Sequence, residues 1–304
     1  MQINTIFNLV QSKFFSEQSK KRGETFIVII ALFSFVFHLL LIGLVHFNII
    51  YLDNSSHFFS NPIAAIYTPF SFILVYEVYL LVYYLPKSTT IYIGKQYEIM
   101  ALIVIRKVFK DLSQLELTTD WFSQKPDMVF TVHLLATLIL FFLIFVFYRL
   151  NEKKDELEEK KTVKSPEINQ FIKIKNRVAS ILIPIFLFLA LYIFGQLIYE
   201  SIFSLNQLVS TFNNDVTRLF FNDFFTILIL TDVFLLLFSL LHTDKFRVVI
   251  RNSGYIISTI LLKMSFGVEG VLNAELIVIA VLFGVAILAI HNQYLKIGTS
   301  KKYA

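Results

Sequence analysis

Acidic and basic residues lie within apolar segments at two places in the chain, and their side chains have the clearest chemical potential. Glu77 stands within "FILVYEVYLLVYYL", and Lys95 and Glu98 follow just after a short turn. Asp232 stands within "TILILTDVFLLLF", and Arg251 follows it in the same way. A buried carboxylate beside a cation can hold a proton, pass an ion or join two helices. The sequence therefore predicts either an ion path or fixed helix contacts at both places.

The composition indicates the environment that surrounds these charges. Of the 304 residues 56% are hydrophobic and 16% are charged, and the mean hydropathy is +0.69. Soluble domains carry about 25% charged residues. Apolar stretches that can cross a hydrocarbon core of roughly 30 Å recur along the chain. These features predict a multi-pass helical membrane protein. The absence of cysteine excludes disulfides and thiolate nucleophiles.

The elements that must position the charges are expected to be eight hydrophobic segments. They lie near residues 26–50, 63–85, 91–109, 128–148, 178–203, 224–241, 255–266 and 276–290. The third and seventh are short and interrupted by charge. The predicted fold is an all-α integral membrane protein, with about eight transmembrane helices arranged as two tandem four-helix bundles.

The Lys and Arg residues predict how the chain is oriented. They gather before the first segment, between the fourth and fifth, after the sixth and at the C-terminus. By the positive-inside rule these regions are cytoplasmic, and so are both termini. Arg106, Lys107 and Lys110 would then lie at the outer end of the third span. We expect the cytoplasmic basic residues to face anionic lipid or a partner; they are Lys20, Lys21, Arg22, Lys161, Lys164, Lys173, Lys175, Arg177, Lys245 and Arg247.

The predicted domains follow from these segments. Residues 1–25 form a cytoplasmic amphipathic helix, and 26–150 form the first membrane unit. Residues 151–177 form a charged linker, in which the fourth span continues as a solvated helix. This linker offers a docking site for a cytoplasmic protein or an anionic ligand. Residues 178–291 form the second membrane unit. Residues 292–304 form a basic cytoplasmic tail.

The two membrane units are expected to be copies of each other. Glu77 aligns with Asp232, Lys95 with Arg251, and Lys107 with Lys263, if the second copy has one extra residue in its turn. Each unit keeps the same orientation, so this is a parallel duplication rather than an inverted repeat.

Within each unit we expect an intramembrane charge network. A hairpin that turns near residues 86–88 places Glu77 level with Glu98 and close to Lys95. Lys95 and Glu98 are three residues apart and so share a helix face. Asp232 and Arg251 would play the paired roles in the second unit. The full predicted network is Glu77, Lys95, Glu98, Arg106, Lys107, Asp232, Arg251 and Lys263.

The stretch "FILVYEVYLLVYYLPKSTTIYIGKQYEIMALIVIRKVFKDL" resembles the core of the bacterial phosphate-starvation-inducible protein E (PsiE) family. That family has an acid in its second span, a base that opens its third, and another base about twelve residues on. Glu77, Lys95 and Lys107 match this pattern, although Lys95 stands where the family has Arg. The resemblance implies a four-span bundle in the bacterial inner membrane, repeated here in tandem, and implies no defined activity.

Two kinds of function remain open. One is a homo-oligomeric ion or proton channel, by analogy with bacterial stress or anti-phage effectors; the other is a non-conducting scaffold or sensor that binds a cytoplasmic partner. A small-solute or ion transporter is less favoured, because no span is broken by Gly–Pro interruptions. We expect no enzyme activity, no cofactor and no metal site, and we expect His38, His46 and His133 to hydrogen-bond neighbouring helices.

Overall fold

The computed structural model describes residues 15–47, 49, 62–86, 88–114, 125–159, 173–182, 184–185, 188–189, 222–238 and 246–300. Every regular element in these ranges is a helix. The labelled helices are α2 (Glu17–His46), η1 (Pro62–Ile66), α4 (Tyr67–Tyr84), α5 (Thr89–Gln114), α6 (Lys125–Glu159), α9 (Phe246–Ser265) and α10 (Val271–Ser300). Residues 173–182 and 222–238 are also helical. The all-helical fold predicted from the sequence is confirmed for this part of the chain.

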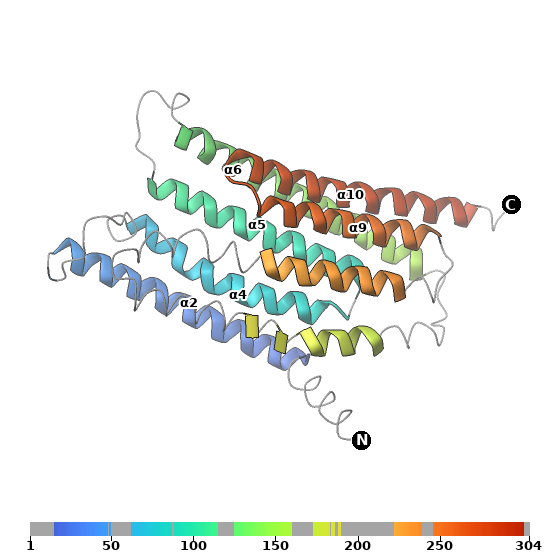
Figure 1. Cartoon of the computed structure of the whole chain (residues 1–304), viewed down its shortest axis with the longest axis horizontal. Helices are drawn as coiled ribbons and strands as arrows, with labels where there is room; N and C mark the ends of the chain where they lie inside the picture. The colour runs from blue at the N-terminus through green and yellow to red at the C-terminus, as the bar shows by residue number, and fades with distance from the viewer. Residues whose placement is uncertain are drawn as a thin grey trace, which may run out of the picture.

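The helices run roughly along one long axis, and α5 lies between two groups of them (Figure 1). On one side α4 packs against α5 and α2 packs against α4. On the other side α6 packs against both α5 and α10, and α9 packs against α10 while also touching α5. The 222–238 helix, orange in Figure 1, lies between α4 and α9 in that view. A residue on α5 can therefore contact helices of both predicted units.

Short-range signals explain where several of these helices begin. The hydroxyl of Ser16 accepts a hydrogen bond from the backbone N–H of Ser19 at 3.1 Å, which caps the start of α2. Asp127 lies in the first turn of α6, where its charge is favourable to the helix dipole. Gly270 has a φ of +64° at the start of α10, a conformation that glycine adopts without strain.

One hydrophobic core includes residues from both predicted membrane units. At its centre the ring of Phe147 contacts the ring of Tyr97, with centroids 5.1 Å apart, and the ring of Tyr255, at 6.1 Å. These three residues come from α6, α5 and α9, and all are at most 2% exposed. The two units thus share an interior.

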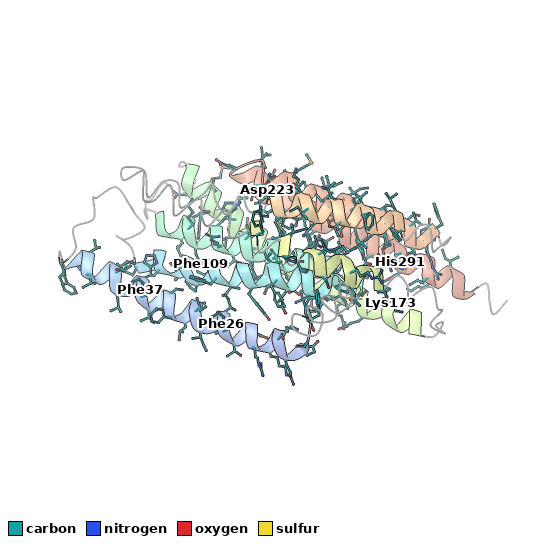
Figure 2. The ribbon with its side chains drawn as sticks, turned by 60° about the horizontal axis from the view of Figure 1, so that its bottom comes forward. Phe26, Phe37, Phe109, Lys173, Asp223 and His291 are labelled. Atoms are coloured by element: carbon teal, nitrogen blue, oxygen red, sulfur yellow. The ribbon has the colours of Figure 1, made fainter. Side chains whose placement is uncertain are left out.

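Within the described ranges, three helices are long and apolar enough to cross a membrane: Glu17–His46, Asp127–Lys154 and Val271–Ile297. They contain the predicted spans at 128–148 and 276–290, and the part of the predicted span at 26–50 that runs from 26 to 46. At 1.5 Å per residue the 30 residues of α2 extend about 45 Å. Figure 2 shows Phe26 and Phe37 on α2, and these side chains are 65% and 52% exposed. A lipid environment explains exposed aromatic side chains on so apolar a helix.

Several predicted boundaries need correction. Helix α2 begins at Glu17, so the predicted border at residue 25 falls inside one continuous helix; residues 1–14 of the predicted amphipathic segment lie outside the described ranges. Helix α9 begins at Phe246 rather than at 255, because "FRVVIRNSG" continues the helical pattern despite its charges. Helix α10 continues to Ser300, beyond the predicted border at 291. As predicted, α6 continues past its apolar part, as far as Glu159.

Candidate functional site

The first acid–base cluster lies between α4, α5 and α6. The Nζ of Lys95 is 2.5 Å from a carboxylate oxygen of Glu98, and these side chains are 21% and 29% exposed. The hydroxyl of Tyr148, on α6, donates a hydrogen bond to the other Glu98 oxygen. Glu77 on α4 lies within electrostatic range of both Lys95 and Glu98. The predicted group of one base and two acids is present, with Tyr148 as an additional member.

Tyrosines connect this cluster to the start of α2. The ring of Tyr84 lies under the Nζ of Lys95, 5.4 Å from the centroid. The Tyr84 hydroxyl accepts a hydrogen bond from the Nζ of Lys20 at 2.8 Å, and the Tyr83 hydroxyl donates to Glu17 at 2.6 Å. Lys20, which the sequence predicts on a lipid-facing or partner-facing surface, is thus directed toward α4. Cation–ring contacts of this kind contribute about 0.5–1 kcal/mol at partly exposed sites.

The second cluster surrounds Asp232 and combines segments far apart in the sequence. Tyr92 and Gln96 of α5 lie beside the Asp232 carboxylate, without the strict geometry of a hydrogen bond, and Lys175 lies within electrostatic range. The Nζ of Lys175 donates to the hydroxyl of Thr89 at 3.0 Å. Asp232 therefore has a cationic neighbour, but the sequence did not identify Lys175 as that cation.

Lys175 is not on the basic surface where the sequence places it. Its side chain is only 5% exposed, and burial lowers the pKa of this amine to about 8, although the charge of Asp232 partly opposes that shift. The helix at 173–182 turns this one residue inward, whereas Lys173 (labelled in Figure 2) and Arg177 are exposed. Lys21 and Arg22 are also exposed; Lys161, Lys164 and Lys245 lie outside the described residues.

Arg251, the predicted partner of Asp232, makes other contacts. Its guanidinium donates to the side-chain oxygen of Asn252, at 3.2 and 3.3 Å, and to the Nε2 of His291 at 3.4 Å. The Nδ1 of His291 donates to the backbone oxygen of Arg247 at 3.1 Å. Since Nδ1 carries the proton in this arrangement, Nε2 is free to accept from Arg251. These contacts fix the start of α9 against the end of α10.

The remaining predicted charges lie toward the other end of α5 and α9. The Nζ of Lys107 donates to the side chain of Asn273 at 2.5 Å and so joins α5 to α10. Arg106 is 7% exposed, and burial lowers the pKa of the neighbouring Lys110. Lys263 occupies the last turn of α9, where a positive charge is favourable to the helix dipole.

Of the three histidines predicted to hydrogen-bond neighbouring helices, His38 and His133 make such contacts. The Nδ1 of His133 on α6 lies 2.5 Å from Asp111 on α5, and the Nδ1 of His38 on α2 lies 2.6 Å from the hydroxyl of Thr68 on α4. Asp111 was not among the predicted site residues. In the part of the chain that the structure describes, no three His, Asp or Glu side chains are grouped closely enough to hold a metal ion.

Helix α5 links the two acid–base clusters. Lys95 and Glu98 lie on its face toward α4 and α6, whereas Tyr92 and Gln96 lie on its face toward Asp232. On that second side the hydroxyl of Thr259, on α9, donates to the side-chain oxygen of Gln96 at 2.8 Å. No family model, curated protein or solved structure matches the chain.

Proposed function

We propose that the protein is a channel-like homo-oligomer of the bacterial inner membrane that passes protons or small cations. The observation that carries the proposal is the presence of a carboxylate on each side of α5, each beside a lysine. Carboxylates in a membrane-spanning bundle are costly and mark ion or proton pathways in many membrane proteins. In this proposal Glu77 and Asp232 are the groups that accept the ion or proton.

The hydrogen bonding of the two acids favours conduction over a purely structural role. One oxygen of Glu77 and one of Asp232 are buried without a hydrogen-bond partner among the described residues. A carboxylate that served only to join helices would be expected to have both oxygens satisfied, because each unpaired buried polar atom costs about 1–3 kcal/mol. An open oxygen is suited to receiving a transient proton or cation.

The neighbouring polar side chains support the same proposal. Tyr148 donates to Glu98, and Tyr92 lies beside Asp232. A tyrosine hydroxyl both donates and accepts hydrogen bonds, so it is suited to passing a proton to or from a carboxylate. The polar contacts of Lys107 and Asp111 continue toward the other end of α5. The proposed path therefore follows α5.

A second candidate function is a non-conducting scaffold or sensor. The observation that favours it is the extension of α6 beyond its apolar part, where Glu152 and Lys153 are exposed on a continuous helix. Such a rigid charged helix offers a docking surface to a cytoplasmic partner. A transporter remains a third alternative. The conduction experiment separates the first candidate from the second.

The test is proton and cation flux into liposomes that contain the purified protein and a pH-sensitive or ion-sensitive dye. We expect flux in the wild type, and flux at the level of protein-free liposomes in Glu77→Gln and in Asp232→Asn. Glu152→Gln removes an exposed acid from α6 and should retain flux. Circular dichroism and size-exclusion chromatography check that each variant is folded, and chemical cross-linking in liposomes measures the number of subunits.

A wild-type protein that is folded, inserted and silent under every applied potential and pH gradient would exclude the channel proposal. It would leave the scaffold as the better hypothesis. Flux that persists in both acid variants would exclude the assigned role of Glu77 and Asp232.

A further inference from the structure

A small cavity lies beside the second cluster, where α5, α9 and the helices at 173–182 and 222–238 meet. Its volume is about 30 Å³, and a cavity of about 10–15 Å³ already holds a water molecule. The polar side chains that line it are those of Thr89, Tyr92, Lys175, Asp232, Asn252 and Tyr255. The cavity thus has room for a small ion with a water molecule, and its lining combines residues of both predicted units.

Two oxygen atoms of this lining are buried without a well-formed hydrogen bond within the described ranges: one carboxylate oxygen of Asp232 and the hydroxyl of Tyr92. Tyr92 lies beside Asp232 and is only 2% exposed. Polar atoms buried in this way require a ligand or an ordered water. Carboxylate, hydroxyl and amide oxygens are the ligands that hard cations prefer.

The charge of the lining limits the kind of ion that fits. Asp232 is the one carboxylate among the residues that line the cavity, and Lys175 balances its charge. A divalent cation is held by several carboxylates or by phosphate groups together with one or two carboxylates. An anion would be repelled by the negative charge of the Asp232 carboxylate. A monovalent cation can replace the proton of Lys175 without changing the net charge of the cavity.

The geometry points to a binding site for one small monovalent cation, such as Na⁺, on the Asp232 carboxylate, in exchange for one proton released from Lys175. In this step the Nζ–H bond of Lys175 breaks and the proton goes to solvent. The neutral amine keeps its place near Thr89, and the cation takes over the charge that faced Asp232. This inference deepens the proposed function, since it rests on Asp232 belonging to the ion path and names its ligand.

The charged and titratable groups around Lys175 are consistent with such an exchange. Asp232 faces it from the 222–238 helix and favours its charged form, whereas Arg251 on α9 disfavours that form. Tyr92 on α5 and Tyr255 on α9 also line the cavity. With the pKa of Lys175 at about 8, the proton competes with the cation below that pH and is absent well above it.

The test is Na⁺ binding to the purified full chain in detergent, measured by calorimetry in sodium and choline salts. We expect one Na⁺ per chain, with an affinity that rises about tenfold per pH unit up to about pH 8 and is constant above it. Addition of Na⁺ to weakly buffered wild-type protein near pH 7.5 should release protons. Asp232→Asn should lose the binding.

Glu152→Gln is the matched control and should bind as the wild type does. The inference is overturned if folded wild-type protein binds no Na⁺ at about pH 9, where Lys175 is neutral, or if Na⁺ binding near pH 7.5 releases no protons. Binding that is retained in Asp232→Asn also overturns it. The proton-release measurement needs no variant, so it decides the matter even if a substitution prevents folding. Na⁺ binding in detergent does not require flux. A protein that binds Na⁺ but shows no flux in liposomes therefore refutes only the channel proposal. A protein that conducts but does not bind Na⁺ refutes only this inference.

Discussion

The two acid–base clusters on α5 use similar side chains in different surroundings. In the first, Lys95 and Glu98 are neighbours on one helix and are 21% and 29% exposed. In the second, Lys175 is 5% exposed and approaches Asp232 from a segment 57 residues away in the sequence. A partly exposed ion pair at short spacing contributes little to the free energy of unfolding. Removing one partner of a buried pair costs much more, because it leaves an uncompensated buried charge. Removing the lysine should therefore lower the free energy of unfolding more in the second cluster than in the first.

The largest expected effect comes from removing each lysine in turn. Lys175→Met leaves Asp232 buried without its cation and should lower the free energy of unfolding by about 3 kcal/mol. Lys95→Met removes a partly exposed ion pair and should cost about 1 kcal/mol or less. Chemical unfolding in mixed micelles, followed by circular dichroism, measures both. Equal losses in the two variants would contradict the proposed difference between the clusters.

The next effect concerns the packing that holds α5 against the second unit. A Cβ added at Gly284 would lie 1.6 Å from the hydroxyl oxygen of Tyr97 and 2.7 Å from its Cζ. That hydroxyl lies 2.8 Å from the Oγ of Ser258, which itself donates to the backbone oxygen of Ala280 at 2.7 Å. Gly284→Ala should therefore cost about 2 kcal/mol through overpacking and loss of the Tyr97 hydrogen bond.

Gly43→Ala, in α2, is the control for that substitution. Nothing lies within 4 Å of a Cβ at Gly43, so alanine should stabilise the helix by about 0.5–1 kcal/mol. The same unfolding assay compares the two variants. A neutral Gly284→Ala would show that α10 can shift away from α5 at little cost.

The smallest expected effect tests the link between α5 and α9 beside Asp232. Thr259→Val removes the hydroxyl that donates to Gln96 at 2.8 Å and should cost about 1 kcal/mol. Thr226→Val removes a hydroxyl that donates, among the described residues, to the backbone oxygen of Asn222 in its own helix, at 2.7 Å, and should be close to neutral. Thermal unfolding of the two variants resolves the difference. A larger loss in Thr226→Val would argue against α5 as the connection between the two sides.

Sequence spacing predicts the local parts of this arrangement. Lys95 and Glu98 meet because a separation of three residues places them on one helix face, and the packing of α4 against α5 brings Glu77 near them. The extension of α6 follows from mixed charges at helical spacing. The contacts of His38 and His133 follow from the general cost of an unpaired polar group between apolar helices.

The other parts depend on tertiary packing, which spacing does not specify. Lys175 lies in a basic segment that resembles many cytoplasmic linkers, and only the packing of the 173–182 helix buries it. The contact between Lys107 and Asn273 joins residues 166 positions apart, and the contact of Asp111 with His133 depends on how α5 and α6 pack against each other. The eight-span count, the tandem duplication and the PsiE resemblance remain predictions.

The ring of Tyr97 over Gly284 also restricts how the protein can move. A slide of α10 along α5 by one helical turn, about 5.4 Å, would bring Ala280 or Leu288 to the place that glycine now occupies. Either side chain would collide with the ring, so axial translation between these helices is blocked. Rotation about this point of closest approach needs no such collision. Any rearrangement that opens a passage along α5 should therefore be a tilting motion with its pivot at Tyr97, in which the two ends of α10 are displaced in opposite directions.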